Sequence, residues 1–507
     1  MKAKRILAAL LAAIMLTGSL AACANGKGDG ETTANPNLPA ESETGSIFSD
    51  ALDEDLDYGE DEVTFISRDK KGWTDSEIAA DTLTGEPVND AVFERNKAVE
   101  ERLGVKIVSL TDNTDSINAV VQKVATAVNG GSKDYDIMAA PCCSVLLWAP
   151  GGTFANVRRE ECEYLDLDRI WWSRGFNEAG EFKGAQYAIL GSSLLSMYRF
   201  GFITVFNKDI FIEANQAFPY EYVENGTWTL DKQASIVPLF YRDDGDGKLE
   251  ETDRYGFVSN TYTTIDAYWS ACQLDIVKKD ENGDLALVLD MNRLHSACDK
   301  IINLFYHTDN GTYKYPGSDD DPIWNGIRSM FANGNAAMAT QRFMEMENEE
   351  MRSMEQQYGV VPLPKYDESQ DGYYTLLHDQ FTVISIPATV TGERLTEMSA
   401  VLEAMSSVSY HLVRPVYYED TLRTKIAQDP VDAEMMDIIT ENVYIDAGIL
   451  YVGYMGLYHH GLRSVIQSAT TNSISKFKAK NQNVVKILRS LSASYDNLIE
   501  NEENEKD

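Results

Sequence analysis

Residues 200–211, FGFITVFNKDIF, predict a buried strand that leads directly into a helix. The segment is mostly apolar up to Phe206, which is typical of a strand covered on both faces. Asn207, Lys208 and Asp209 break the apolar run, and a helical pattern follows over residues 210–217. Because strand and helix patterns lie on both sides of it, we expect this segment to carry the chain from one lobe to a second, across a ligand cleft.

The size and charge of the chain narrow the possible architectures and partners. A chain of 507 residues exceeds the size at which a single hydrophobic core stops growing, so two domains are expected. It carries 44 basic and 80 acidic residues, for a formal net charge of −36. This excess of negative charge disfavours nucleic acid and anionic lipid head groups as partners.

The first 22 residues have the pattern of an export signal. A basic start precedes an apolar run over residues 6–16, which is too short for a typical membrane-spanning helix. Residues 20–23, Leu-Ala-Ala-Cys, then resemble the cleavage site of a bacterial lipoprotein, in which Cys23 is acylated and becomes the mature N-terminus. We therefore expect a signal peptide over residues 1–22 and lipid anchoring, through palmitate or a similar chain, on the outer face of the cytoplasmic membrane.

Residues 23–62 are polar and strongly acidic. Between residues 24 and 62 there are twelve Asp or Glu residues and one Lys, with few large apolar side chains. Such a composition buries too little apolar surface to offset the entropy of the chain, so we expect a disordered tether.

The remaining cysteines do not indicate a metal site or a disulfide framework. Five are left once Cys23 is assigned to the lipid, and none of them forms a C-x-x-C pair. We expect most of them to be small buried side chains.

Strands alternate with helices after the tether. The predicted strands cover residues 63–67, 105–110 and 135–140, and the predicted helices cover 89–103 and 117–127. This order is typical of parallel βαβ units in an α/β fold, whose ligands bind beyond the carboxyl ends of the strands. The residues expected at that crevice are 68–73 and 142–144.

Four later segments carry a family resemblance. They are Phe206-Asn207-Lys208-Asp209, Thr227-Trp228-Thr229, the stretch from Phe331 to Met338, and the stretch from Tyr358 to Pro364. In this order they resemble the extracellular solute-binding proteins of carbohydrate ABC transporters, the maltose-binding-protein-like group.

The resemblance implies an α/β fold of the periplasmic-binding-protein type, with two lobes that close around a ligand. Lobe one is expected over residues 63–200 and 375–425, and lobe two with the C-terminal helices over 201–374 and 426–500. The implied function is a monomeric binding protein, not an enzyme. It captures a sugar or oligosaccharide and delivers it to an ABC permease.

Sugar recognition requires aromatic faces for the rings and polar groups for the hydroxyls. By the resemblance and the strand ends, the candidate ligand contacts are Asp69, Lys70, Ser144, Tyr198, Arg199, Tyr268, Trp269, Phe343, His378, Asp379, Tyr458 and His459. Where the family often places an aromatic or charged residue, this chain has Cys142-Cys143-Ser144, so a non-sugar solute remains an alternative ligand.

Residues 242–253, RDDGDGKLEETD, resemble an EF-hand calcium loop. The expected ligands of a structural calcium ion are Asp244, Asp246, Glu250 and Asp253, with Asp243 able to replace one of them. Arg242 at the first position and the short Asp253 at the last depart from the pattern, and a solvated acidic turn is the alternative. No other cofactor is expected.

Two other functions fit a secreted chain of this size. An extracellular glycoside hydrolase would need two carboxylates facing each other across a cleft, and no motif marks such a pair. A surface adhesin would favour repeats and a composition rich in strands, Gly and Thr, and the sequence has neither.

Overall fold

The computed structural model describes residues 47–504, except residues 75, 115, 318–320, 424–429 and 456. The predicted signal peptide and the predicted lipid-bearing Cys23 lie outside these residues. Residues from Ser46 onward belong to one compact unit. In the described part of the chain no helix is both long and apolar enough to cross a membrane.

Lobe one is built on a four-stranded sheet with the order β11-β3-β1-β2. The first three strands in the chain run parallel, and β11 joins antiparallel beside β3. They confirm the predicted βαβ pattern. Their bounds are β1 (Asp61–Arg68), β2 (Val105–Asp112), β3 (Ile137–Pro141) and β11 (Thr382–Ser385).

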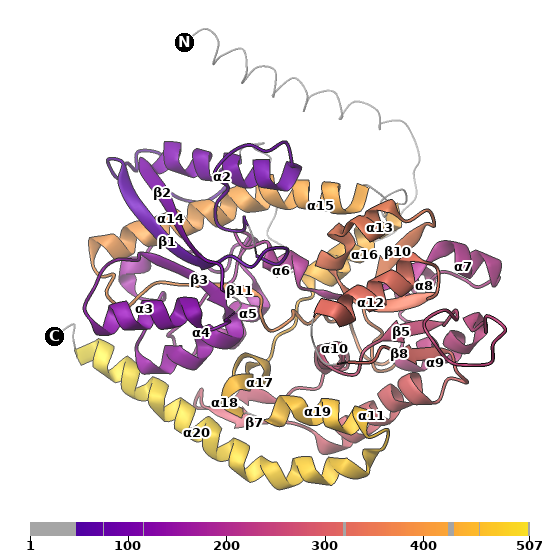
Figure 1. Cartoon of the computed structure of the whole chain (residues 1–507). Coiled ribbons are helices and arrows are strands. Elements are labelled where there is room, and N and C mark those ends of the chain that lie inside the picture. The colour runs from indigo at the N-terminus through magenta and orange to yellow at the C-terminus, as the bar shows by residue number, and fades with distance from the viewer. Residues whose placement is uncertain are drawn as a thin grey trace, which may run out of the picture. The chain divides into compact units, whose positions relative to one another are not determined.

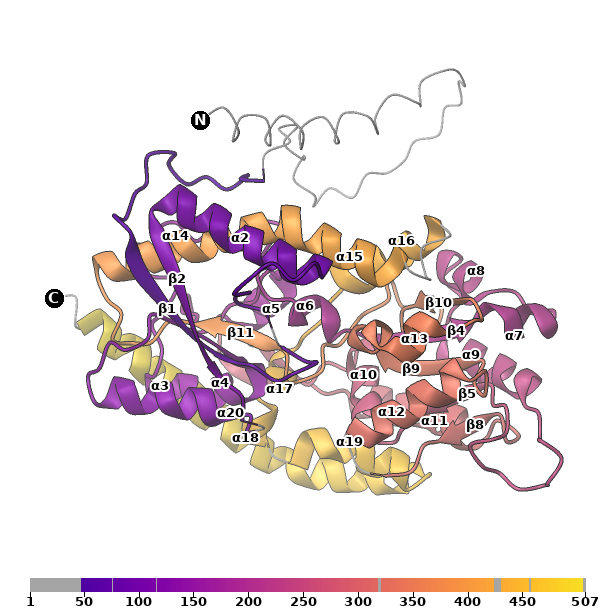
Figure 2. The same ribbon diagram turned by 45° about the horizontal axis from the view of Figure 1, so that its top comes forward.

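Helices cover both faces of this sheet: α2 and α14 lie on one side, and α3 and α4 on the other (Figure 1, Figure 2). The predicted helix that ends at Gly104 is α2, and Gly104 has the left-handed conformation (φ 60°) that favours glycine at a helix end. The helices of lobe one are α2 (Pro87–Leu103), α3 (Ala119–Asn129), α4 (Cys142–Trp148), α5 (Arg174–Gly180), α6 (Ser196–Arg199) and α14 (Glu393–Val408).

Lobe two is built on a separate five-stranded sheet, and the segment at residues 200–211 begins it. Every residue of β4 is buried, and Asn207 then caps the next helix by accepting a hydrogen bond from the backbone N–H of Ile210. The predicted crossing into a second sheet is confirmed. The order is β10-β4-β9-β5-β8, with bounds β4 (Phe202–Asn207), β5 (Phe257–Ser259), β8 (Thr312–Lys314), β9 (Met338–Arg342) and β10 (Tyr358–Val361).

Short helices and one hairpin surround this second sheet. Thr229 caps α9 by accepting a hydrogen bond from the backbone N–H of Lys232 through its side chain. The helices are α7 (Lys208–Glu213), α8 (Pro219–Glu224), α9 (Leu230–Ile236), α10 (Thr263–Ala271), α11 (Met291–Tyr306), α12 (Asp321–Ala332) and α13 (Glu349–Ser353), and the hairpin joins β6 (Val277–Lys279) to β7 (Leu285–Leu287).

The C-terminal region is helical, as predicted. α15 continues α14 toward lobe two, and the long α20 runs beneath both lobes in Figure 1. The elements are α15 (Arg414–Arg423), α16 (Pro430–Glu441), α17 (Ala447–Leu450), α18 (Val452–Met455), α19 (Leu457–Gln467) and α20 (Ile474–Asn504).

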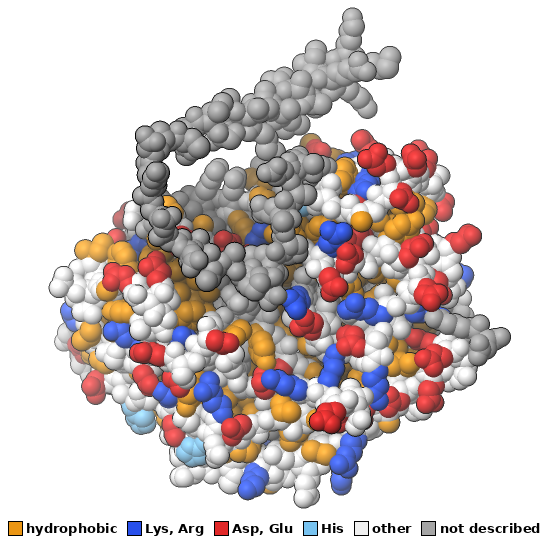
Figure 3. Space-filling view, turned by 180° about the vertical axis from the view of Figure 1, so that it is seen from behind, with side chains coloured by type: hydrophobic (Ala, Val, Ile, Leu, Met, Phe, Trp, Pro, Cys, Tyr) orange, Lys and Arg blue, Asp and Glu red, His pale blue; other side chains and the backbone are white. Residues whose placement is uncertain are grey.

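The predicted disordered tether over residues 23–62 is wrong at its end, because part of it is folded and β1 already begins at Asp61. Leu52 is buried against lobe one, and Asp50 accepts two hydrogen bonds from Arg102, both of 2.7 Å. Four of the five described cysteines are buried, as predicted. On the face shown in Figure 3, acidic and basic side chains are interspersed.

Candidate ligand-binding site between the lobes

The loop after β1 presents Trp73 to lobe two. The Thr74 hydroxyl donates to the carbonyl of Arg68 at 3.0 Å and accepts from the backbone N–H of Lys70 at 3.1 Å. The backbone N–H groups of Trp73 and Thr74 both donate to the carbonyl of Lys70. These bonds close a tight turn, so the position of the Trp73 side chain is fixed by the end of the strand.

A buried Arg and a buried Glu hold the next part of this loop. Arg95 on α2 is completely buried and donates to the carbonyls of Ile78 (2.5 Å) and Ser193 (3.0 Å). Glu77 accepts from the N–H of Ser196 and the hydroxyl of Thr382, both at 2.7 Å. Burial raises the pKa of Glu77, and its hydrogen bonds oppose that shift.

Trp73 is the centre of an aromatic cluster where the lobes meet. Its ring lies edge-on to Phe200 (centroids 5.6 Å apart) and to His378 (5.5 Å). Phe202, at the start of β4, lies 6.2 Å from both His378 and Trp324 of lobe two. We call Trp73, Phe200, Phe202, Trp324 and His378 the interlobe aromatic cluster.

Arg342, the last residue of β9, lies within this cluster between two indole rings. Its guanidinium carbon is 4.6 Å from the ring centroid of Trp73 and 4.2 Å from that of Trp324. Trp73 belongs to lobe one and Trp324 to lobe two. The cation therefore contacts an aromatic ring from each of the two lobes.

The polar contacts of Arg342 are few for a side chain that is 1% exposed. Nη2 donates to Glu345 at 2.5 Å, and the same carboxylate accepts from Arg328 at 2.6 Å. Nε and Nη1 of Arg342 have no hydrogen-bond partner among the described residues. This is unusual, because buried polar groups are normally hydrogen-bonded.

A second link between the lobes lies beside the cluster. Arg199, at the end of α6, donates to both oxygens of Glu347 in lobe two, at 2.9 and 2.7 Å. It also donates to the carbonyl of Trp73 at 3.0 Å, and the Tyr417 hydroxyl donates to Glu347 at 3.0 Å. Charge-assisted hydrogen bonds thus join the end of α6 in lobe one to Glu347, which follows β9 in lobe two.

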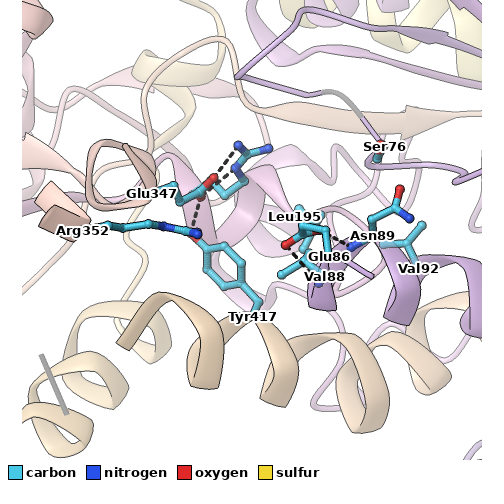
Figure 4. A pocket seen from close by; sticks show the side chains of 10 residues that line it. Ser76, Glu86, Val88, Asn89, Val92, Leu195, Glu347, Arg352 and Tyr417 are labelled. Atoms are coloured by element: carbon cyan, nitrogen blue, oxygen red, sulfur yellow. Dashed lines mark hydrogen bonds and ion pairs between the residues drawn. The ribbon is translucent and has the colours of Figure 1, made fainter. Parts of the chain in front are cut away.

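This link borders a cavity of about 230 Å³ (Figure 4). In the close-up Glu347 and Tyr417 lie at one end, and residues of the α2 N-terminus lie at the other. A second cavity, of about 350 Å³, lies under the loop of residues 74–84 and shares Ser76 and Asn89 with the first. The first is lined by Ser76, Glu86, Val88, Asn89, Val92, Leu195, Arg199, Glu347, Arg352 and Tyr417.

Several predicted contact residues meet at Trp73. The Lys70 ammonium lies 3.7 Å from its ring centroid, and Arg199 and His378 make the contacts given above. Asp379 lies next to them, with a carboxylate oxygen 3.5 Å from Nδ1 of His378. Asp69 lies in the same loop as Lys70 and lines the second cavity.

The other predicted residues lie elsewhere. Ser144 is buried in α4 and donates to Asn118 at 2.7 Å. Tyr198 is buried against Tyr417 and Tyr418 and donates to Ser192 at 2.8 Å. Tyr268 and Trp269 are fully buried in α10, and Phe343 is buried just after β9. The side chains of Tyr458 and His459 lie outside the described residues.

Sequence reasoning did not select Trp324 or Arg342 as contacts. Arg342 ends a strand whose residues are all buried, so a charged residue there was a detectable signal. The sequence around Trp324 gave no such indication, because Trp324 reaches the aromatic cluster only through its contact with a strand from another part of the chain.

The acidic loop forms a cluster of carboxylates on lobe two. Oxygens of Asp243, Asp244 and Asp253 lie within 4.8 Å of one another. Asp246 instead pairs with Lys248 at 2.7 Å, and Asp253 accepts from the backbone N–H of Asp244 at 2.9 Å. Two of the four predicted calcium ligands, with Asp243, are therefore close enough to share one cation.

Comparisons with known proteins give matches among solved structures. No protein-family model matches the chain, and no curated protein matches it. An ABC transporter solute-binding protein from Thermotoga lettingae, bound with α-D-tagatose, is 15% identical, with a TM-score of 0.54 over 84% of this chain and 100% of that chain.

Two further structures match over similar lengths. The cyclic α-maltosyl-1,6-maltose binding protein from Arthrobacter globiformis is 12% identical, with a TM-score of 0.54 over 85% of this chain and 100% of that one. An ABC substrate-binding protein from Listeria monocytogenes, in complex with cycloalternan, is 14% identical, with a TM-score of 0.52 over 84% and 98%. The chain has the fold of ABC-transporter solute-binding proteins, as predicted.

Proposed function

We propose that this protein is the extracytoplasmic binding component of an ABC transporter and captures a sugar or oligosaccharide between its two lobes. The observation that carries the proposal is the interlobe aromatic cluster, which sits at the junction of the two sheets in a fold shared with binding proteins. The names of the matching structures give tagatose, cycloalternan and a maltosyl-maltose as the ligands of those proteins.

The working motion is closure of the lobes. Trp73 and Arg199 lie on lobe one, and Arg342 and Glu347 lie on lobe two, so opening would separate Trp73 from Arg342 and break the Arg199–Glu347 pair. A ligand that binds between the lobes would restore the closed form, which a permease would recognise. Asp69, Lys70, His378 and Asp379 are the proposed hydrogen-bonding groups for sugar hydroxyls.

Lipid on Cys23 would hold the protein at the outer face of the cytoplasmic membrane, where a monomer could meet its permease. The supporting observation is the Leu-Ala-Ala-Cys sequence after the basic and apolar start. Metabolic labelling with a palmitate analogue should label the chain, and Cys23→Ser should abolish the label.

The proposed role is binding without chemistry, since the matching structures named above are described as binding proteins. The test is a thermal-shift screen of the purified protein against a panel of mono- and oligosaccharides, with the sugars analysed afterwards by chromatography. We expect one saccharide class to raise the melting temperature and to be recovered unchanged. Appearance of a hydrolysis product would contradict the proposal, and so would stabilisation by a non-sugar solute alone.

We also propose that the acidic loop of lobe two binds a structural calcium ion. The close approach of Asp243, Asp244 and Asp253 supports this, because clustered carboxylate oxygens are the ligands that calcium prefers.

A further inference from the structure

Arg342 has more hydrogen-bonding capacity than the protein uses. Nε and Nη1 have no partner among the described residues, so more than half of its N–H donors have no acceptor. The side chain is nevertheless 1% exposed, so water does not satisfy these donors from the surface. Leaving a buried charged donor without an acceptor is costly, and such a group in a native structure needs an explanation.

The charge of Arg342 is also incompletely balanced. Its carboxylate partner Glu345 is shared with Arg328, and both of these side chains are buried. Arg328 has a further partner in Glu350, at 3.0 Å, but the Glu350 side chain is 49% exposed. Two buried guanidinium groups therefore share one buried carboxylate, whereas buried charges are normally paired.

The two indole rings pack against the guanidinium of Arg342, one from each lobe. The N–H groups of a guanidinium point outward in its own plane, so the unused donors of Arg342 lie along its edge. Because the two rings belong to different lobes, opening the lobes removes one of them and uncovers the cation. The ammonium of Lys70 lies on the Trp73 ring as well, which adds positive charge at the same place.

We propose that the ligand is an acidic saccharide, and that its carboxylate binds the free edge of Arg342 between Trp73 and Trp324. This inference rests on the proposed function and specifies its substrate class. A hydroxyl of a neutral sugar can accept a hydrogen bond from Arg342, but it leaves the buried positive charge uncompensated. A carboxylate supplies both the acceptors and the charge, and charge-assisted hydrogen bonds are about twice as strong as neutral ones.

The experiment compares ligands that differ only in this charge. Binding is measured by isothermal titration calorimetry of the purified protein with three groups of ligands. The first is galacturonic acid and its short oligomers, the second is the methyl esters of these compounds, and the third is galactose and its oligomers. A second series, based on glucuronic acid and glucose, is measured in parallel. We expect the acid to bind about 10- to 100-fold more tightly than its ester. In Arg342→Gln this preference should disappear, so that acid and ester bind with affinities within about threefold of each other.

A matched variant controls for the loss of positive charge. Arg254 lies on lobe two, away from the cluster, and pairs with Glu213 at 2.6 Å. Arg254→Gln should keep the full preference for the acid. Circular dichroism of each variant checks that it is folded.

Each outcome decides the question. The acidic ligand would be ruled out by equal affinity for acid and ester, by tighter binding of the neutral sugar, or by an unchanged preference in Arg342→Gln. In each of these cases the proposed saccharide-binding function would still stand. If no saccharide of either kind binds, the proposed function fails together with this inference.

Discussion

Arg95 and Arg342 are both almost completely buried arginines, but their surroundings differ. Every guanidinium nitrogen of Arg95 donates to a protein acceptor: Nε to Asn96 at 2.8 Å, and the two terminal nitrogens to carbonyls that include Ser193 and Ile78. Within the described part of the chain Arg342 donates to Glu345 alone, and two indole rings pack against its guanidinium.

The difference distinguishes an arginine that stabilises the fold from an arginine that is available to bind a ligand. A buried cation whose donors are all satisfied holds elements together, as Arg95 does for α2 and the loop that follows Trp73. A buried cation with unused donors contributes less to folding than its burial costs, and it is explained by a partner outside the chain. The predictions below test this contrast.

The largest expected effect is on folding. Arg95→Met removes the guanidinium donors from the buried carbonyls of Glu77, Ile78 and Ser193, of which Ile78 keeps a hydrogen bond from Asn96. We expect the free energy of unfolding to fall by about 3–5 kcal/mol, measured by urea denaturation. Lys97→Ala on the same helix is the control: its side chain is 50% exposed, and the loss should stay within about 0.5 kcal/mol.

If Arg95→Met lowers the free energy of unfolding no more than Lys97→Ala does, then Arg95 does not hold the loop, and the proposed contrast with Arg342 is wrong.

The next largest effect is expected in the pH dependence of stability, at a buried carboxylate whose hydrogen-bond donors are uncharged. Glu403 accepts from the indole N–H groups of Trp171 (3.0 Å) and Trp172 (2.9 Å). Burial raises its pKa to about 7, and these hydrogen bonds oppose that shift. Between about pH 4.5 and 7 the folded protein binds this proton more tightly than the unfolded chain does, so stability should fall as the pH rises through this window.

Unfolding free energies at several pH values check this point. We expect the loss attributable to Glu403 to be about 3 kcal/mol and complete above about pH 7. Glu403→Gln should flatten the slope in this window. Asp446, whose pKa burial also raises to about 7, would keep a remaining slope in the variant. An identical pH profile for wild type and variant would exclude Glu403 as the source.

A smaller effect is expected at the acidic loop. Calcium at about ten times its dissociation constant should stabilise the protein by about 1.4 kcal/mol, and a chelator should reverse the shift in melting temperature. Asp244→Asn should remove the response. Asp231→Asn, at an exposed carboxylate that pairs with Lys300, should retain it. A response that persists in Asp244→Asn would place the ion elsewhere.

The sequence was sufficient where the information is local. The apolar run up to Phe206 with the polar break at Asn207, and the helical pattern over residues 89–103, predicted real elements, because strand burial and helix ends depend on neighbouring residues. The three-residue strands β5 and β8 were not predicted, because such short segments become strands only through pairing with a sheet that the rest of the chain builds.

The candidate site was predictable only in part for the same reason. Lys70 and His378 were selected because they lie beside predicted strand ends, where ligands of α/β sheets bind. The contact of Trp73 with Arg342 joins residues that are far apart in the sequence and on different lobes. Whether the donors of Arg342 are satisfied depends on Glu345 and Arg328 in three dimensions, and no local pattern contains that information.

The smallest expected effect on stability is at Arg342 itself. Arg342→Met keeps the apolar volume between Trp73 and Trp324 and removes a buried cation whose donors are largely unused. Glu345 keeps its bond to Arg328, so no carboxylate is left unpaired. We expect the free energy of unfolding to change by less than about 1 kcal/mol in either direction, because replacing a poorly compensated buried charge by an apolar side chain is often neutral. The same urea titration measures it beside Arg95→Met. A loss as large as that of Arg95→Met would mean that Arg342 is a structural residue whose cation–π contacts outweigh its missing hydrogen bonds, and the contrast between the two arginines would then no longer point to a ligand.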